Sequence, residues 1–183
     1  MKVAIILGSV REGRLGERVA KWTMNEAAKA ESLELNLIDL KAAALPVFND
    51  ATVPGARTEP YADSAARTWS EVMAAADGYI FVTAEYNHTI PGALTNALDY
   101  LGRELTDKPA VIISYSTGPV GGARSAEHLS NALTYMRALV ASVVSIGVAD
   151  KVIDEAGVLA VSGPEKALTG AFARLLKLGA LAK

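Results

Sequence analysis

Apolar residues occur along the chain in two kinds of run that alternate with each other. Short runs rich in β-branched residues predict five strands, at Val3–Leu7, Leu33–Leu40, Tyr79–Thr83, Ala110–Tyr115 and Ser142–Val148. The second run alternates apolar with polar positions, which is typical of an edge strand. The other four show no period of two, which indicates strands buried on both faces of a parallel sheet.

Between the predicted strands, apolar residues recur at the spacing of a helix. Helices are expected through Leu15, Val19 and Trp22, over about Asp63–Ala76 and Pro91–Leu101, through Leu129, Leu133, Met136 and Val140, and after Pro164. The segment 44–60 holds three prolines and predicts a long loop. The segment 149–162 predicts a short hairpin or flap.

Strands that alternate with helices, joined by right-handed crossovers, predict a single α/β domain over residues 1–183, a doubly wound three-layer sandwich. Five strands favour the order 2-1-3-4-5 over the six-stranded dinucleotide-binding order. Ligands bind such sheets at the carboxyl ends of the strands, where the first and third strands meet. The candidate site therefore lies in the segments after strands one, three and four: Gly8–Gly16, Ala84–Gly92 and Ser114–Arg124.

The composition excludes several classes of function. Hydrophobic residues make up 51% of the 183 positions, enough for a buried core, and a net charge of −2 leaves no cationic excess to bind nucleic acid. The absence of cysteine and the presence of only two histidines, His88 and His128, argue against disulfides, thiolate chemistry and a metal centre. No apolar run is long enough for a signal peptide or a membrane span, so we expect a soluble cytoplasmic chain.

The first candidate segment, Gly8–Gly16, has the features of a phosphate-binding loop. Its glycines allow close approach of the backbone, and the helix that follows directs its N–H groups and the positive end of its dipole toward the loop. Ser9 offers a hydroxyl, and Arg11 or Arg14 offers charge-assisted hydrogen bonds. A plain strand-to-helix turn with solvated arginines is the alternative.

Two better-known nucleotide loops do not fit this segment. Gly8 and Gly13 have the spacing of a P-loop, but Arg14 stands in place of its lysine and Leu15 in place of the hydroxyl that holds Mg²⁺. Val10 occupies the second glycine position of the dinucleotide fingerprint. A P-loop nucleotide-binding protein is therefore disfavoured.

The other two segments offer groups that suit a flat heterocycle. Asn87 has both a donor and an acceptor for the edge of a ring, and Tyr86 offers an aromatic face. Gly118, Gly121 and Gly122 allow backbone N–H groups to approach a ligand. An Asx-turn and a flexible glycine turn, respectively, are the alternatives.

Taken in order and spacing, the three segments resemble the NAD(P)H-dependent FMN reductase family of the flavodoxin-like fold. The family's G-S-x-R loop is matched at Gly8–Arg11, and its E-Y-N motif at Glu85–Asn87. Its P-G-x-L-K-N-A-I-D-Y block is matched at Pro91–Tyr100, and its Gly-Gly loop near an arginine at Gly118–Arg124. The resemblance covers residues 1 to about 148, and its second motif is the most specific.

Two positions depart from the family pattern. Ala84 stands where the family usually has proline, and Leu15-Gly16 stands where many relatives carry serine or asparagine. The resemblance implies that FMN binds with its phosphate at Ser9, Arg11 and the start of the first helix, and with its ring against the second and third segments. The residues expected to bind FMN are Ser9, Arg11, Arg14, Leu15, Gly16, Glu85, Tyr86, Asn87, Ser116, Gly118, Gly121 and Gly122.

The activity that the resemblance implies is FMN-dependent oxidation of NADPH or NADH, with ping-pong hydride transfer through flavin N5. The acceptors would be quinones, azo dyes, metal oxyanions or free flavin. FMN carries this chemistry, so neither a catalytic side chain nor a metal is expected. An FMN-binding redox sensor or electron-transfer protein that regulates a partner is the alternative. Arg11, Arg14, Arg57 and Arg124 are candidates to contact the 2′-phosphate of NADPH, and the sequence does not rank them.

The resemblance also implies assembly as a homodimer or tetramer through the helix Pro91–Leu101, with FMN near the interface. The apolar face of this helix exceeds what one face of a sheet needs. His88 is interpreted as a loop-surface or subunit-contact residue, and His128 as a solvated one.

Overall fold

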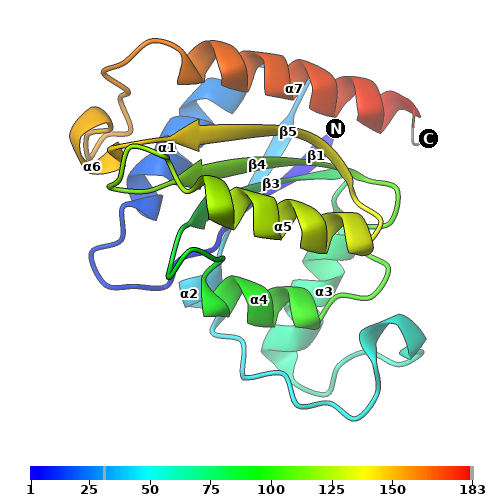
Figure 1. The fold of residues 1–183 in the computed structure, drawn as a ribbon. Coiled ribbons are helices and arrows are strands. Elements are labelled where there is room, and N and C mark those ends of the chain that lie inside the picture. Colours follow the sequence, from blue (N-terminus) through cyan, green and yellow to red (C-terminus); the bar gives the residue numbers. More distant parts are fainter. Residues whose placement is uncertain (31, 182–183) are drawn as a thin grey trace.

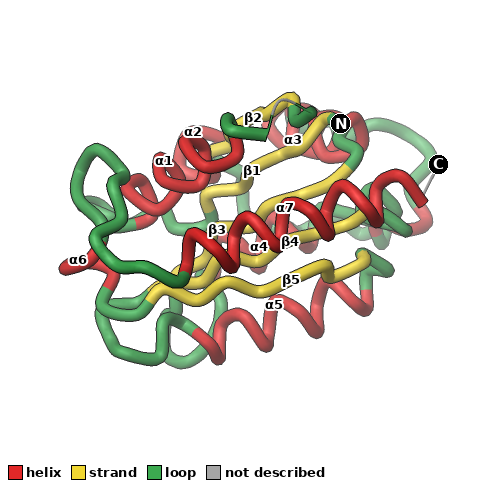
Figure 2. Tube along the Cα trace, turned by 90° about the horizontal axis from the view of Figure 1, so that it is seen from above, coloured by secondary structure: helices red, strands yellow, loops and turns green. Residues whose placement is uncertain are grey.

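The computed structural model describes residues 1–30 and 32–181, and it confirms the predicted fold class. Five parallel strands form one sheet in the order β2-β1-β3-β4-β5 (Figure 2). Their bounds are β1 Lys2–Leu7, β2 Glu34–Asp39, β3 Gly78–Ala84, β4 Pro109–Tyr115 and β5 Leu139–Ile146.

The five long helices that were predicted are present, and shorter turns are added to them. The helices are α1 Gly16–Ala27, α2 Leu40–Ala43, η1 Pro54–Ala56, α3 Ser64–Ala75, α4 Gly92–Asp99, α5 Ala123–Tyr135, α6 Ala149–Val152 and α7 Pro164–Leu181. The long loop expected over 44–60 contains only η1. The predicted hairpin or flap over 149–162 consists of α6 and an antiparallel bridge between Ile153 and Leu159.

Helices cover both faces of the sheet and divide the core into two layers. In β1, Ala4 and Ile6 face one layer and Ile5 and Leu7 face the other, and all four are buried. Helices α3, α4 and α5 pack on the first face, and α1 and α7 pack on the second (Figure 1). This burial on both faces explains why β1, β3 and β4 read as continuous apolar runs.

The prediction for the last strand was wrong in two respects. It begins at Leu139 rather than Ser142, so Val140 belongs to β5 and not to the preceding helix, which ends at Tyr135. It is also an edge strand, in which Val143 is 44% exposed while Val144 is buried. The edge position of β2 was predicted correctly.

The apolar face of α4 is covered by the chain itself. Leu94, Ala97 and Leu98 are buried in the same core layer as Tyr61 and Trp69. The indole Nε1 of Trp69 donates to the carbonyl of Ala97 at 2.7 Å. Helix α3 and the loop before it therefore cover the apolar face of α4 that the sequence suggested for a subunit contact.

Candidate functional site

A cavity of about 270 Å³ opens at the carboxyl ends of β1, β3 and β4, at the left of Figure 1. It is lined by Ser9, Arg11, Gly13, Arg14, Leu15, Ala84, Glu85, Tyr86, Tyr115, Ser116 and Thr117. Three loops far apart in sequence thus meet where the fold predicts a ligand site. Most of the predicted residues lie here, whereas Gly16, Asn87, Gly118, Gly121 and Gly122 do not line the cavity.

Ser9 and Tyr86 connect the first loop to the second. Their hydroxyl oxygens lie 2.5 Å apart in a hydrogen bond, and the Ser9 residue is buried. The guanidinium carbon of Arg11 lies 5.8 Å from the centre of the Tyr86 ring. The exposed Arg11 therefore stays at the cavity with a cation–π contact beneath it, and its hydrogen-bond donors are available to a ligand.

Arg14 supports the first loop from behind. Its guanidinium donates to both carboxylate oxygens of Asp39, at 2.7 and 2.5 Å, and to the carbonyl of Ser9 at 2.5 Å. It also donates to Glu17 at 3.1 Å, and its side chain is only 4% exposed. Arg14 therefore makes four hydrogen bonds within the protein and holds the loop in place. Arg11 is the arginine of the loop whose donors remain available to a ligand.

This arrangement keeps the carboxyl group of Asp39 ionised. Burial acts to raise the pKa of Asp39. Hydrogen bonds from Arg14 and from the backbone N–H of Lys41, with the attraction of both cations, outweigh burial and hold the pKa below its usual value. Arg14 and Asp39 are 25 residues apart, so the sequence alone does not indicate that they form an ion pair. Asp39 nevertheless stands near the predicted end of the second strand.

Glu85 ties the second loop to the third. Its carboxylate accepts hydrogen bonds from the backbone N–H and the guanidinium of Arg124, at 3.1 and 3.4 Å, and its side chain is 12% exposed. The contacts lie at the first turn of α5, where a carboxylate is favourable. Glu85 borders the cavity, but its charge is neutralised by these donors.

The second loop is held in a strained turn. The backbone N–H groups of Tyr86 and Thr89 each donate to the other's carbonyl at 2.9 Å. Asn87 and His88 between them have φ of 50° and 63°, in the left-handed region that is costly for non-glycine residues. His128 donates or accepts a hydrogen bond to the Thr89 hydroxyl at 2.9 Å, so it is exposed as predicted but also fastened to the turn.

The glycines of the third loop have a packing role. Gly121 and Gly122 have φ of +67° and +76°, and an added Cβ would lie 2.9 Å from the backbone at the end of β5 and 3.0 Å from that of β4. The carbonyl of Gly118 accepts hydrogen bonds from the Ser116 hydroxyl and from the N–H of Val148, both at 3.0 Å. These contacts fix the loop so that Ser116 lines the cavity.

The donors around the cavity suit a phosphate group. Helix α1 begins here with Leu15 as its N-cap, and no side chain caps its first N–H groups. Tyr115, which the sequence analysis missed, is buried, and its hydroxyl interacts with the side chain of Ser9. Uncapped helix N–H groups and the Arg11 cation are together a donor set for an anion.

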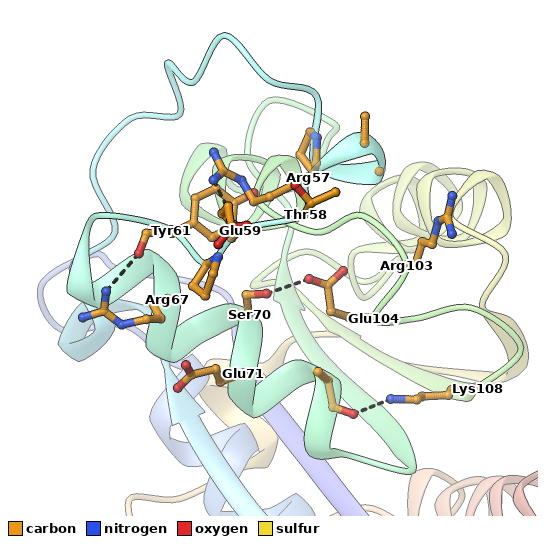
Figure 3. Close-up of a pocket in the computed structure, with 15 residues that line it drawn as sticks. Arg57, Thr58, Glu59, Tyr61, Arg67, Ser70, Glu71, Arg103, Glu104 and Lys108 are labelled. Carbon is orange, nitrogen blue, oxygen red and sulfur yellow. Dashed lines mark hydrogen bonds between the residues drawn. The ribbon is translucent and has the colours of Figure 1, made fainter.

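A larger cavity lies at the opposite end of the sheet. It measures about 740 Å³ and is bounded by η1, α3 and the turn that precedes β4 (Figure 3). Polar groups across it bond to one another: Ser70 donates to Glu104, and Lys108 donates to the carbonyl of Ala74, each at 2.7 Å. Arg57 lies here, where it pairs with Asp50. No predicted motif reaches this cavity, so the cavity of about 270 Å³ at the carboxyl ends of the strands is the candidate site.

Two kinds of feature are missing from the residues that the structure describes. No group of three or more histidine, aspartate or glutamate side chains lies in a position to hold a metal ion. No helix in the same part of the chain is long and apolar enough to cross a membrane.

The fold and the cavity at its switch point define a flavodoxin-like α/β protein with a donor-rich cavity at the start of α1. The chain belongs to the NADPH-dependent FMN reductase family, whose sequence profile matches residues 1–151. FMN is the cofactor and NAD(P)H the co-substrate of this family, so the protein is an oxidoreductase.

Named relatives agree with this assignment. The chain is 37% identical over 142 residues to the NAD(P)H-dependent FMN reductase LOT6 of Saccharomyces cerevisiae, and the alignment covers 73% of each of the two proteins. It is 36% identical over 144 residues to a quinone reductase of Escherichia coli K12, covering 76% of this chain and 73% of that one. The fold matches the solved structure of FerB, a flavoenzyme NAD(P)H:(acceptor) oxidoreductase from Paracoccus denitrificans, with a TM-score of 0.73 at 23% identity over 97% and 96% of the two chains.

Proposed function

We propose that the protein oxidises NAD(P)H and reduces quinones by ping-pong turnover, with azo dyes, metal oxyanions and free flavin as further acceptors. With a quinone, NAD(P)H and one proton yield NAD(P)⁺ and the hydroquinone, so two electrons and two protons reach the acceptor. Bound FMN supplies the hydride relay between the two substrates. Because its reductant is NAD(P)H, we place the reaction in the cytoplasm.

The observation that carries this proposal is the meeting of three loops around one donor-rich cavity. Ser9, Arg11 and the first N–H groups of α1 would hold the phosphate. The turn at Tyr86–Thr89 and the loop at Ser116 would border the ring. These residues bind and orient, and none is required to donate or accept a proton from its side chain.

A visible absorption spectrum tests the proposal directly. The purified protein is mixed with FMN, separated from free flavin, and treated with NADPH under anaerobic conditions. A bound-flavin spectrum that bleaches rapidly and recovers when a quinone is added supports the enzyme. Slow bleaching, together with partner binding that depends on the flavin state, would favour the redox sensor. Failure to bind FMN would contradict both.

Arg11 is expected to contribute strongly to FMN affinity. Replacing Arg11 with alanine should weaken binding by about 1.5–3 kcal/mol, roughly ten- to 150-fold, because a charge-assisted hydrogen bond to the phosphate is lost. Titration of flavin fluorescence gives the dissociation constant. Arg57→Ala at the far cavity is the matched control and should leave it unchanged. An unaltered constant in Arg11→Ala would remove Arg11 from the site.

The structure separates the four arginines considered for a 2′-phosphate contact. Arg14 is buried against Asp39, and Arg57 lies at the opposite end of the sheet. Arg11 and Arg124 are exposed at the cavity or beside it. These two are therefore the arginines we propose for any preference for NADPH over NADH.

We propose that the protein assembles as a homodimer or tetramer through the helix Pro91–Leu101 and the loop that covers it. Gly92 and Thr95 are exposed on α4, and Val47 in the loop is 82% exposed. Light scattering at micromolar concentration should give at least twice the 19.1 kDa mass of one chain. Val47→Asp should lower that mass, and Val158→Asp on the other face should not. A monomeric mass for the wild type would refute this assembly.

A further inference from the structure

Two buried hydroxyl groups lie between the end of β3 and the start of α5. Thr83, in β3, and Ser125, in α5, are fully buried, and their hydroxyl oxygens lie 3.1 Å apart. The Ser125 hydroxyl donates to the backbone carbonyl of Ala84 at 2.8 Å. Because each hydroxyl has one proton, Thr83 donates either to Ser125 or, at 3.1 Å, to the same carbonyl. Buried hydroxyls are costly unless they are bonded, so Ser125 is the side chain that ties α5 to the end of β3.

The backbone of α5 holds the residue that follows. The Glu85 carboxylate accepts hydrogen bonds from the N–H groups of Arg124 and Ser125, at 3.1 and 3.5 Å. Ser125 therefore contacts two successive residues, Ala84 through its hydroxyl and Glu85 through its N–H. The second loop leaves the sheet at this point, since β3 ends at Ala84. Alanine does not fix the backbone torsion φ as proline does, so the direction of the chain here depends on such contacts.

The segment that Ser125 holds is a wall of the candidate site. Residues Ala84–Tyr86 line the cavity of about 270 Å³, whereas Ser125 does not. The turn that follows contains Asn87 and His88, with φ of 50° and 63°. Such a conformation is costly and persists only where the surrounding contacts impose it. Loosening the end of β3 would therefore displace both the wall and the turn.

We propose that Ser125 is a positioning residue for the flavin ring: it does not touch the ligand, but its hydroxyl fixes Ala84–Tyr86, against which the ring would lie. This inference rests on the proposed function, because it assigns that segment to the ring of FMN. It divides the site into two parts. Arg11 and the start of α1 would act on the phosphate, and Ser125 acts on the ring side alone.

The test compares FMN with riboflavin, which has the ring but lacks the phosphate, in the Ser125→Ala variant. Loss of one hydrogen bond to the loop should raise both dissociation constants by the same factor, about three- to tenfold. Arg11→Ala should weaken the binding of FMN and leave that of riboflavin unchanged. At saturating FMN, the visible absorption bands of Ser125→Ala should shift toward those of free FMN, because the ring is held less firmly.

Thr23→Val is the matched control, since the Thr23 hydroxyl is also fully buried but donates to the carbonyl of Val19 within α1, at 2.9 Å. It should lower the melting temperature, as Ser125→Ala does, and leave both flavin affinities and the absorption bands unchanged. Thr83→Val tests the same link by a second route. It keeps the bond from Ser125 to Ala84, so its effect on flavin affinity should be smaller than that of Ser125→Ala.

Hydrogen exchange of the flavin-free protein separates this inference from the proposed function. Ser125→Ala should speed exchange of the N–H groups of Tyr86 and Thr89, which close the turn, without speeding exchange across the sheet. Faster exchange throughout the chain, unchanged flavin affinities, or a larger effect of Thr83→Val would overturn the inference. If the wild type binds neither flavin, the proposed function is contradicted, and faster exchange confined to the turn would retain Ser125 as the residue that positions this loop.

Discussion

Replacing Gly16 with alanine is expected to abolish most FMN binding and to destabilise the fold. The new methyl group would lie 2.4 Å from the Tyr115 oxygen and 2.6 Å from a methyl carbon of Leu7, far inside van der Waals contact. Overpacking of this kind costs about 1–3 kcal/mol, and the helix terminus or the phenol has to move. We expect FMN affinity to fall at least about tenfold, measured by fluorescence titration, with a lower melting temperature.

Gly170 provides the matched control for this substitution. It also lies in a helix, α7, but an added Cβ would meet nothing within 4 Å. Gly170→Ala should raise stability by about 0.5–1 kcal/mol, the usual gain of alanine over glycine in a helix. The double variant Gly16→Ala/Tyr115→Phe should recover part of the lost stability, because the contact with the hydroxyl is removed. Strictly additive effects would show that Tyr115 is not what Gly16 accommodates.

Replacing Arg14 with alanine is expected to weaken both the fold and the phosphate loop. The variant loses two hydrogen bonds to Asp39 and one to the carbonyl of Ser9, and it leaves Asp39, whose side chain is 31% exposed, without its main partner. We expect a loss of about 2–3 kcal/mol in the free energy of unfolding, between the values for exposed and buried ion pairs. FMN affinity should fall about tenfold or more because the loop is no longer held, and riboflavin affinity should fall less.

Arg18, on α1 just after the first loop, supplies the reference for an ordinary exposed ion pair. It lies 3.6 Å from Glu155, which is 90% exposed. Arg18→Ala should cost less than about 1 kcal/mol and leave flavin binding unchanged. If Arg14→Ala lowers stability but leaves the FMN dissociation constant at the wild-type value, Arg14 supports the fold alone and does not position the loop.

The pair also predicts a defined dependence on pH. Because the folded state holds the pKa of Asp39 below its unfolded value, the pair contributes its full stability above the usual aspartate pKa of about 3.9. That contribution is lost as the pH falls through the lowered value. The difference in stability between the wild type and Asp39→Asn should therefore be constant from about pH 5 to 8 and shrink in acid.

The sheet was predictable because burial on both faces requires uninterrupted apolar runs, and β1, β3 and β4 have them. The same reasoning failed at β5, where Val143 and Val144 are both β-branched although only Val144 is buried. Short strands of valine look alike whether they are central or at an edge, so composition alone cannot separate them. The 2-1-3-4-5 order itself requires β5 to be an edge.

The location of the site was also predictable, since it follows from where parallel strands end. The roles within it were not. Arg14 and Arg11 are both arginines. Only the pairing with Asp39, distant in sequence, shows that Arg14 holds the loop while Arg11 remains available to a ligand. Tyr115 reads as the last apolar residue of a strand, and its contact with the start of α1 becomes evident only when the structure places Gly16 beside it.

The C-terminal helix α7 lies beyond residue 151, where the match to the family ends, yet it completes one face of the core. Leu168, Phe172 and Leu175 are buried in the same layer as Val111 and Val144. The unit that folds is therefore longer than the unit of sequence similarity. Chimeras that exchange substrate-binding loops between relatives should keep each sheet with its own α7, because a graft cut at the family boundary would strip the cover from β4 and β5.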